Sequence, residues 1–219
     1  MIYEDLMNKL NQHVSRNKNL QETTKEIFKD YNCDHIYTHS FNVAKLAKEL
    51  AEINNLDIEA AFTAGLLHDI SGIIPNNKRI SIAEDMNIPI LVEERKFPLI
   101  IHQKISEVIA NKIFNVNNKQ VLSAIGCHTT LKVKSSKFDN ILFVADKIEW
   151  DQAGSPPYLE KILESIDISI YHGSYAYINF LMNQKDQLKV VHPWLLEAYG
   201  DLTYKIGKDT NENNLKTLM

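Results

Sequence analysis

Glycine and proline are scarce in this sequence, with 7 and 6 among 219 residues. Few segments alternate apolar and polar residues, so the pattern of a half-buried sheet is also largely missing. Apolar residues instead recur three and four positions apart along most of the chain, which is typical of amphipathic helices. The sequence therefore predicts an all-α fold, a helical bundle in a single domain with a C-terminal helical extension.

Long hydrophobic runs are missing too. No stretch approaches the roughly 18 uninterrupted apolar residues of a membrane span, and residues 1–5 lack the features of a signal peptide. The two cysteines, Cys33 and Cys127, have no zinc-ribbon spacing and indicate free thiols in a reducing compartment. The net charge is −4, which gives no basic footprint for nucleic acid. We expect a cytoplasmic protein that binds neither a membrane nor a nucleic-acid polymer.

Start signals and breaks divide the chain into predicted helices. Thr38 and Asp57 are typical N-cap residues, and Pro98 fits the first turn of a helix. The predicted helices span residues 2–16, 20–31, 38–54, 57–70, 78–87, 89–96, 98–114, 119–128, 136–149, 158–167, 169–187 and 193–206.

The most informative stretch is Ala64–Ile70, where His68 and Asp69 end a strongly apolar run. A run of this kind belongs to a core, and burying an unpaired carboxylate there is costly. A metal cation would compensate for the charge. Imidazole and carboxylate together suit divalent iron, manganese, nickel or zinc. The alternative for one such pair is a core histidine that is simply hydrogen-bonded.

Four further side chains of the metal-ligand type lie on apolar stripes of other predicted helices, where residues three, four and seven apart share a face. His39 shares a face with Val43 and Leu46, and His102 shares one with Ile105. Burying so many polar groups without a shared cation would be costly, so the pattern predicts a metal site. The candidate ligands are His39, His68, Asp69, His102, His128 and Asp146.

The ordered set His39, His68-Asp69 and Asp146 resembles the H…HD…D arrangement of the HD-domain metal-dependent phosphohydrolases, an all-helical superfamily. The chain is most similar to the bacterial YqeK-like branch, whose members cleave diadenosine tetraphosphate symmetrically to two ADP. The resemblance covers roughly residues 35–150. It rests on Ala64–Asp69, on His102 after an apolar run, on His128–Thr130 and on Val144–Glu149.

Four positions depart from the pattern of that branch. Gly72 stands where the branch usually has lysine, Gln103 where it has glycine, Trp150 where it has proline, and Gln152 where it has arginine. The missing lysine and arginine resemble phosphate-handling groups, and glutamine cannot replace the bidentate, charged contact of arginine. The resemblance therefore implies the metal chemistry more directly than it implies the substrate.

The resemblance implies two divalent transition metals, with iron favoured and manganese, nickel and zinc as alternatives. Asp69 would bridge them; His39, His68 and Asp146 would complete one site, and His102 and His128 the other. It also implies a division into N-terminal helices (1–34), an HD metal-binding core (35–150), C-terminal helices of the same domain (151–207) and a tail (208–219).

Other residues are candidates for handling the substrate. Asp69 and Lys147 are the candidate catalytic residues, although a solvated surface lysine is the alternative for Lys147. Arg79, Thr129 and Lys132 are candidates for binding substrate phosphate. The alternatives are a helix-end cap for Thr129 and a solvated loop for Lys132.

These features together predict a metal-dependent phosphohydrolase acting on a nucleotide, with symmetrical cleavage of diadenosine tetraphosphate to ADP as the leading reaction. One alternative is a regulatory HD module that binds a nucleotide with little or no turnover. Another is a helical interaction protein with a structural metal. A homodimer is compatible with the sequence.

Overall fold

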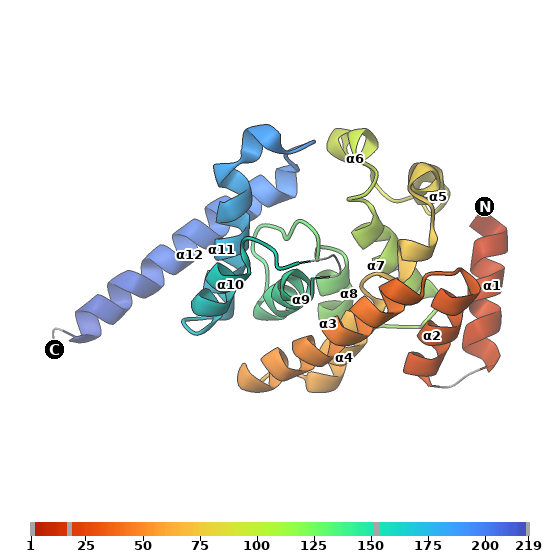
Figure 1. Cartoon of the computed structure of the whole chain (residues 1–219), viewed down its shortest axis with the longest axis horizontal. Helices are drawn as coiled ribbons and strands as arrows, with labels where there is room; N and C mark the ends of the chain where they lie inside the picture. The colour runs from red at the N-terminus through yellow and green to blue at the C-terminus, as the bar shows by residue number, and fades with distance from the viewer. Residues whose placement is uncertain (1–2, 17–18, 151–153, 218–219) are drawn as a thin grey trace.

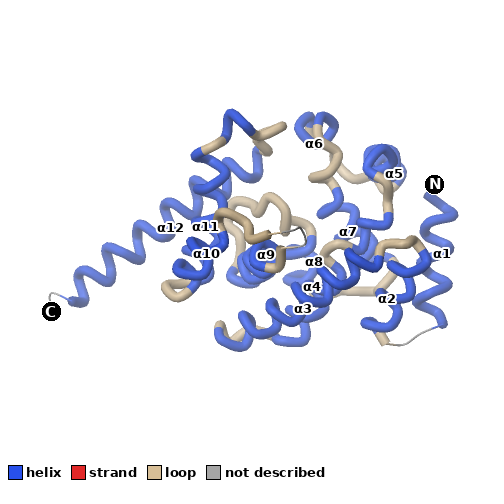
Figure 2. The backbone as a smooth tube through the Cα atoms, in the orientation of Figure 1, coloured by secondary structure: helices blue, strands red, loops and turns tan. Residues whose placement is uncertain are grey.

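The structure is a computed structural model that describes residues 3–16, 19–150 and 154–217, with side chains described as far as residue 207. Every regular element in these ranges is a helix and none is a strand, which confirms the predicted all-α fold (Figures 1 and 2). The α-helices are α1 (Tyr3–Arg16), α2 (Leu20–Asp30), α3 (Asp34–Ile53), α4 (Ile58–Leu67), α5 (Arg79–Asp85), α6 (Val92–Lys96), α7 (His102–Lys112), α8 (Lys119–Ile125), α9 (Lys137–Ile148), α10 (Leu159–Ile166), α11 (Ile170–Asn183) and α12 (Pro193–Thr217). Short 3₁₀ helices lie at Ile70–Ile73, Asn76–Lys78 and Lys185–Gln187.

Helices α3, α4 and α9 form the centre of the molecule. Helix α9 packs against α3, α4, α8 and α11, and α3 packs along α4. At Gly65 the two backbones touch, because a Cβ there would lie 2.4 Å from the Cα of Ala44. Only glycine permits this approach. The close packing brings the C-terminal end of α4 against the N-terminal half of α3.

One continuous apolar core joins the helices, from Leu6 in α1 to Leu202 in α12. Helix α12 then extends away from the body, so that the two ends of the chain lie on opposite sides of the molecule (Figure 1). It runs to Thr217, beyond the end predicted at residue 206. No helix within the described ranges has the length and apolar character needed to cross a membrane.

Three predicted helix starts are wrong. Helix α6 begins at Val92, three residues after the start predicted at residue 89. Helix α3 begins at Asp34, four residues before Thr38, whose hydroxyl donates to the Asp34 carbonyl (3.1 Å) from inside the helix. This i−4 bond uses the group that a cap would have offered to the backbone. Helix α7 begins at His102 rather than at Pro98, since residues 98–101 form turns.

A buried polar network fastens the start of α12 to α6 and α7. Glu94, with none of its surface exposed, accepts bonds from Lys104 Nζ (2.9 Å) and His192 Nε2 (3.3 Å). The Lys104 ammonium also lies 4.7 Å from the ring centre of Trp194. Because these charges are paired and hydrogen-bonded, their burial is tolerated. The network fixes the helix whose first residue is His102.

Candidate metal centre

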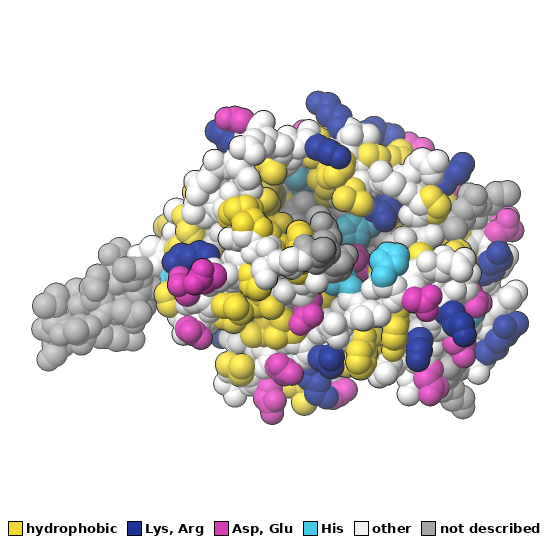
Figure 3. Space-filling view, viewed as in Figure 1, with side chains coloured by type: hydrophobic (Ala, Val, Ile, Leu, Met, Phe, Trp, Pro, Cys, Tyr) yellow, Lys and Arg dark blue, Asp and Glu magenta, His cyan; other side chains and the backbone are white. Residues whose placement is uncertain are grey.

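A cavity of about 430 Å³ opens where the ends of the central helices meet. Figure 3 shows histidine side chains gathered in a hollow of this face. Five of the six candidate ligands line the cavity, and they come from five places in the chain. These are His39 on α3, Asp69 directly after α4, His102 at the start of α7, His128 after α8 and Asp146 on α9. The sixth, His68, lies behind them and is fully buried.

Three of the histidines are oriented by the same local bond. In each, Nδ1 lies within hydrogen-bonding distance of the carbonyl oxygen three residues earlier. The pairs are His68 with Gly65 (2.7 Å), His102 with Leu99 (2.6 Å) and His128 with Ile125 (2.8 Å). A carbonyl only accepts, so Nδ1 must carry the proton, which leaves the Nε2 lone pair free to bind a cation. Such backbone bonds are the usual outer support of metal-ligating histidines.

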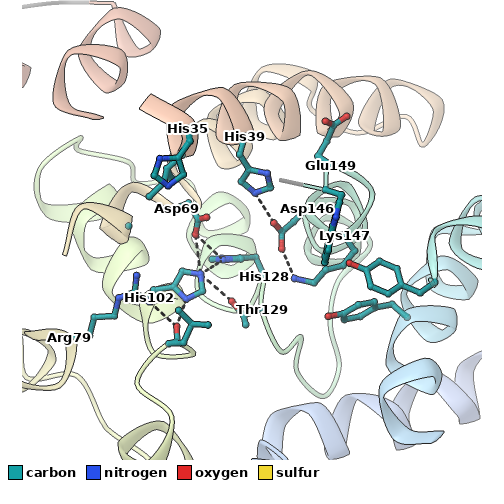
Figure 4. A pocket seen from close by; sticks show the side chains of 16 residues that line it. His35, His39, Asp69, Arg79, His102, His128, Thr129, Asp146, Lys147 and Glu149 are labelled. Carbon is teal, nitrogen blue, oxygen red and sulfur yellow. Dashed lines mark hydrogen bonds and ion pairs between the residues drawn. The ribbon is translucent and has the colours of Figure 1, made fainter. Parts of the chain in front are cut away.

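The first group of side chains gathers around Asp146. Its Oδ1 lies 3.1 Å from His39 Nε2 and 3.4 Å from His68 Nε2. These three residues lie close enough together to hold one metal ion. Figure 4 shows His39 pointing across the cavity at this carboxylate.

The second group gathers around Asp69. Its Oδ1 lies 3.0 Å from His102 Nε2 and 3.5 Å from His128 Nε2. Its Oδ2 lies 3.6 Å from His68 Nε2, which links the two groups. His68, Asp69 and His128 also meet the geometric requirement for one metal ion.

Several atoms of the cluster fit a cation better than they fit each other. His68 Nε2 and Asp69 Oδ1 are buried and make no hydrogen bond, although each lies within ion-pair distance of neighbouring ligands, and a missing hydrogen bond is costly for buried polar atoms. His102 Nε2 lies 2.8 Å from His128 Nε2. Since both rings already donate through Nδ1, two lone pairs face each other unless a proton or a cation lies between them. The donor set of imidazole and carboxylate suits a divalent transition metal.

The pKa shifts in the cluster have two opposing causes, since the aspartates favour positive charge and burial opposes any charge. Burial would lower the pKa of His68, but the carboxylates of Asp69 and Asp146 outweigh it and raise that pKa to about 9. Burial lowers the pKa of His128 to about 4, with a further contribution from the neighbouring histidines. Burial opposes ionisation of Asp69, but His68 and His102 hold its pKa well below the usual range.

Lys147 is a buried ion-pair partner and not a solvated surface lysine. Its side chain is 11% exposed, and its ammonium contacts Asp146 Oδ2. It also lies 5.2 Å from the ring centre of Phe143 and 5.5 Å from that of Tyr177. Burial disfavours the charged form, but Asp146 outweighs it and raises the pKa of Lys147. Lys147 therefore brings a fixed positive charge to the cavity wall.

Arg79 and Thr129 also line the cavity. Arg79 is buried and donates through Nε to the Ile74 carbonyl and through Nη1 to the Leu99 carbonyl, both at 3.2 Å. The Leu99 carbonyl is the one that also orients His102. Thr129 Oγ1 lies 3.3 Å from His102 Nε2.

Lys132, by contrast, is not among the residues that line the cavity. Its ammonium donates to Ser123 Oγ (2.7 Å) and lies 4.0 Å from Asp139. The lysine is thus held between α8 and α9, and the site proposed below does not include it.

Gln103, one of the four departures from the related branch, holds the segment that follows a candidate ligand. Its side chain is fully buried. Its Oε1 accepts from the backbone N–H groups of Thr129 (3.0 Å) and Thr130 (3.3 Å), and its Nε2 donates to Thr130 Oγ1 (3.1 Å). It therefore clamps the segment directly after His128. The signal in the sequence was an uncharged amide directly after a candidate ligand, His102.

The other three positions that depart from the pattern of the related branch are Gly72, Trp150 and Gln152. Gly72 lies in the cavity wall under Ile36, whose Cδ1 would be 2.7 Å from a Cβ at position 72. An apolar side chain thus packs against the position at which the related branch usually has lysine. Trp150 lines the cavity and is 37% exposed. Gln152 falls outside the described residues.

Comparison with known proteins agrees with this geometry. Residues 36–151, more than half of the chain, match the family model described as HD domain. A protein of Lactococcus lactis subsp. cremoris described as "Uncharacterized protein in pepC 5'region" is 47% identical over 152 residues, which cover 69% of this chain and 77% of that protein.

Two further proteins are similar to this chain, one with a named enzymatic activity and one with a solved structure. The symmetrical bis(5'-nucleosyl)-tetraphosphatase of Staphylococcus aureus is 30% identical over 173 residues, which cover 75% of this chain and 86% of that protein. A solved structure, a predicted HD superfamily hydrolase involved in NAD metabolism from Clostridium acetobutylicum, aligns with a TM-score of 0.75. The alignment covers 84% of this chain and 97% of the other at 23% identity, so it shows a shared fold.

Proposed function

The chain belongs to the HD domain family of hydrolases, and we propose that it is a metal-dependent phosphohydrolase that cleaves diadenosine tetraphosphate symmetrically to two ADP. The observation that carries the proposal is the cluster of four histidines and two aspartates, in which the buried atoms His68 Nε2 and Asp69 Oδ1 make no hydrogen bond. A cluster built in this way at the floor of an open cavity can place cations against a bound phosphate.

We propose that the six ligands hold two divalent transition metals, iron first, with manganese, nickel and zinc as alternatives. Asp146 with His39 and His68 would hold one, and His102 with His128 the other. The two oxygens of Asp69 face different histidines, Oδ1 toward His102 and Oδ2 toward His68. This supports Asp69 as the ligand shared by both metals.

When bound, such a metal pair would activate water for attack and neutralise charge on the phosphoryl oxygens. The residues of the chain do the rest. Asp69 and Asp146 stay ionised because cationic groups lower their pKa values despite burial. Lys147 holds a proton at Nζ beside Asp146, where it can donate a hydrogen bond to a phosphate oxygen. Ile36 and Leu99 form apolar parts of the cavity wall.

Arg79 lies on the other side of the cluster from Lys147 (Figure 4). Its Nε and Nη1 are used by backbone carbonyls, so Nη2 keeps two N–H donors for a phosphate oxygen. We propose Arg79 as a replacement for the phosphate contact that Gly72 does not provide, with Thr129 as a neutral donor. Cations on both sides of a central metal cluster suit a chain of four phosphates that is cut in the middle.

Chromatography of the reaction products tests the proposal. Metal-stripped protein is supplied with iron, manganese, nickel or zinc in turn and given diadenosine tetraphosphate, with the stripped protein as control. ADP as the sole nucleotide product is the expected result. ATP with AMP would overturn the symmetrical cleavage, and no turnover with any metal would overturn the hydrolase proposal for this substrate.

The second candidate is a regulatory module that binds a nucleotide without turnover. Gly72 in the cavity wall favours it, because this position lacks the lysine of the related branch. Nucleotide-induced thermal stabilisation without products would identify this case.

For either function we propose a cytoplasmic location, since two free thiols suit a reducing compartment.

A further inference from the structure

A second cavity, of about 350 Å³, adjoins the metal-lined one. The two share wall residues at His35, His39, Glu149 and Trp150. A molecule that reaches the metal cluster can therefore continue past His39 into this second space. Both cavities have volumes in the range of roughly 300–1,000 Å³ that is usual for small-molecule sites.

One wall of the second cavity is a polar stripe of α3. His35, Thr38, His39 and Asn42 recur at the spacing of one helix face. Within the described part of the chain, no hydrogen bond or ion pair engages the side chains of His35 and Asn42. The carboxylate of Glu149, on the opposite wall, is likewise without one among the described residues. These groups remain available to a ligand.

The opposite wall also carries the aromatic side chain of Trp150, which packs against other aromatic rings. Trp150 meets Tyr158 at an interplanar angle of 83° and a centroid distance of 6.1 Å. Tyr158 is buried and packs in turn against Tyr177 (4.8 Å) and Phe180 (5.4 Å). Trp150 is thus the outer, 37% exposed member of a cluster anchored in the core. An indole held in this way can serve as a stacking platform for a base.

The charges of the two cavities differ. Glu149 lies in the wall that both cavities share, but Lys147 and Arg79 line only the metal-lined cavity, and the residues that line the second one include no lysine or arginine. Phosphate groups are therefore favoured in the first cavity, where these two cations lie, over the second. An uncharged, aromatic and hydroxylated group suits the second cavity better.

We propose that the second cavity holds a nucleoside of the substrate, with its base stacked on Trp150. Glu149 can accept bonds from the ribose hydroxyls, as acidic residues do in dinucleotide-binding folds. The Asn42 carboxamide offers the donor and acceptor pair that matches adenine. The inference rests on the proposed nucleotide substrate, and it assigns a role to Trp150, where the related branch usually has proline.

Fluorescence tests base stacking without turnover. The chain has two tryptophans, so Trp194→Phe leaves Trp150 as the single reporter. The zinc-loaded variant is titrated with ADP and, in parallel, with pyrophosphate, which carries the phosphates without the base. We expect quenching by ADP and little change with pyrophosphate. Equal responses to the two ligands would overturn the proposal.

Kinetics test the same contact in the working enzyme. For Trp150→Ala we expect the KM for diadenosine tetraphosphate, divided by the KM for inorganic tripolyphosphate, to rise about tenfold, the size of one lost base–aromatic stack. Trp150→Phe should restore most of the ratio. Tyr204→Ala, which removes a 65% exposed aromatic ring on α12, is the control and should keep the wild-type ratio.

The two proposals fail in distinguishable ways. If ADP quenches Trp150 but no nucleotide is hydrolysed, the hydrolase proposal is overturned and the nucleoside site is supported. If diadenosine tetraphosphate is hydrolysed but ADP leaves the fluorescence and Trp150→Ala leaves the KM ratio unchanged, the nucleoside site is overturned and the hydrolase proposal stands.

Discussion

Replacing Gln103 by leucine should be unusually destabilising for a change of one uncharged side chain. Gln103→Leu keeps a similar volume but removes the bonds to the N–H groups of Thr129 and Thr130 and to the Thr130 hydroxyl. Thr130 is 3% exposed, so water does not replace the lost partner there. A buried donor left unsatisfied costs about 1–3 kcal/mol. With two backbone donors affected, we expect a loss of about 2–4 kcal/mol.

Thermal and urea unfolding of the metal-stripped protein measure this loss without the contribution of bound cations. At roughly 2–4 °C per kcal/mol for a domain of this size, we expect the Tm to fall by about 4–16 °C. Gln120→Leu, at an exposed position of α8, is the matched control and should change the stability by less than about 0.5 kcal/mol. A Gln103→Leu protein as stable as this control would refute the clamp.

Three further outcomes are expected. Arg79→Ala should raise the KM for diadenosine tetraphosphate at least tenfold in steady-state assays, because a hydrogen bond to a charged group contributes about 1.5–3 kcal/mol. Arg79→Lys should recover only part of this, since lysine lacks the planar fork. Chelation should lower the Tm measured by calorimetry and zinc should restore it, because the facing lone pairs of His102 and His128 then regain a cation. Burial opposes ionisation of Glu94, but bonds from His192 and Lys104 hold its pKa below the usual range. Its stabilisation is therefore present above the unfolded-state value of about 4.3 and lost as the pH falls through the lower folded-state value. The Tm of metal-free Glu94→Gln should accordingly fall less steeply below pH 4 than that of wild type.

The helical fold was predictable because its cause is local. Apolar spacing marks every α-helix, and Asp57 does cap α4, where its carboxylate accepts from the N–H groups of Glu59 and Ala60. The start of α3 was missed because Thr38 bonds backward to Asp34, which no capping preference reveals. The start of α7 was missed because the Leu99 carbonyl, in the turn before it, binds distant groups such as Arg79.

The candidate ligands could be named from the sequence because the HD pattern fixes their order. The local structure around each ligand could not be predicted from the sequence. His68, His102 and His128 lie at helix ends instead of along helical stripes, where each can bond a carbonyl three residues back. The position of Lys132 depends on Ser123 and Asp139, which come from two different helices, so only the folded chain shows it.

Metal titration of the chelator-stripped protein under anaerobic conditions, read by elemental analysis after removal of free iron, tests the metal centre most directly. The wild type should retain two iron ions per chain, and Asp69→Ala should retain fewer than one while its circular dichroism stays helical. Retention of no transition metal by the wild type, or equal retention by Asp69→Ala, would contradict a metal pair bridged by Asp69.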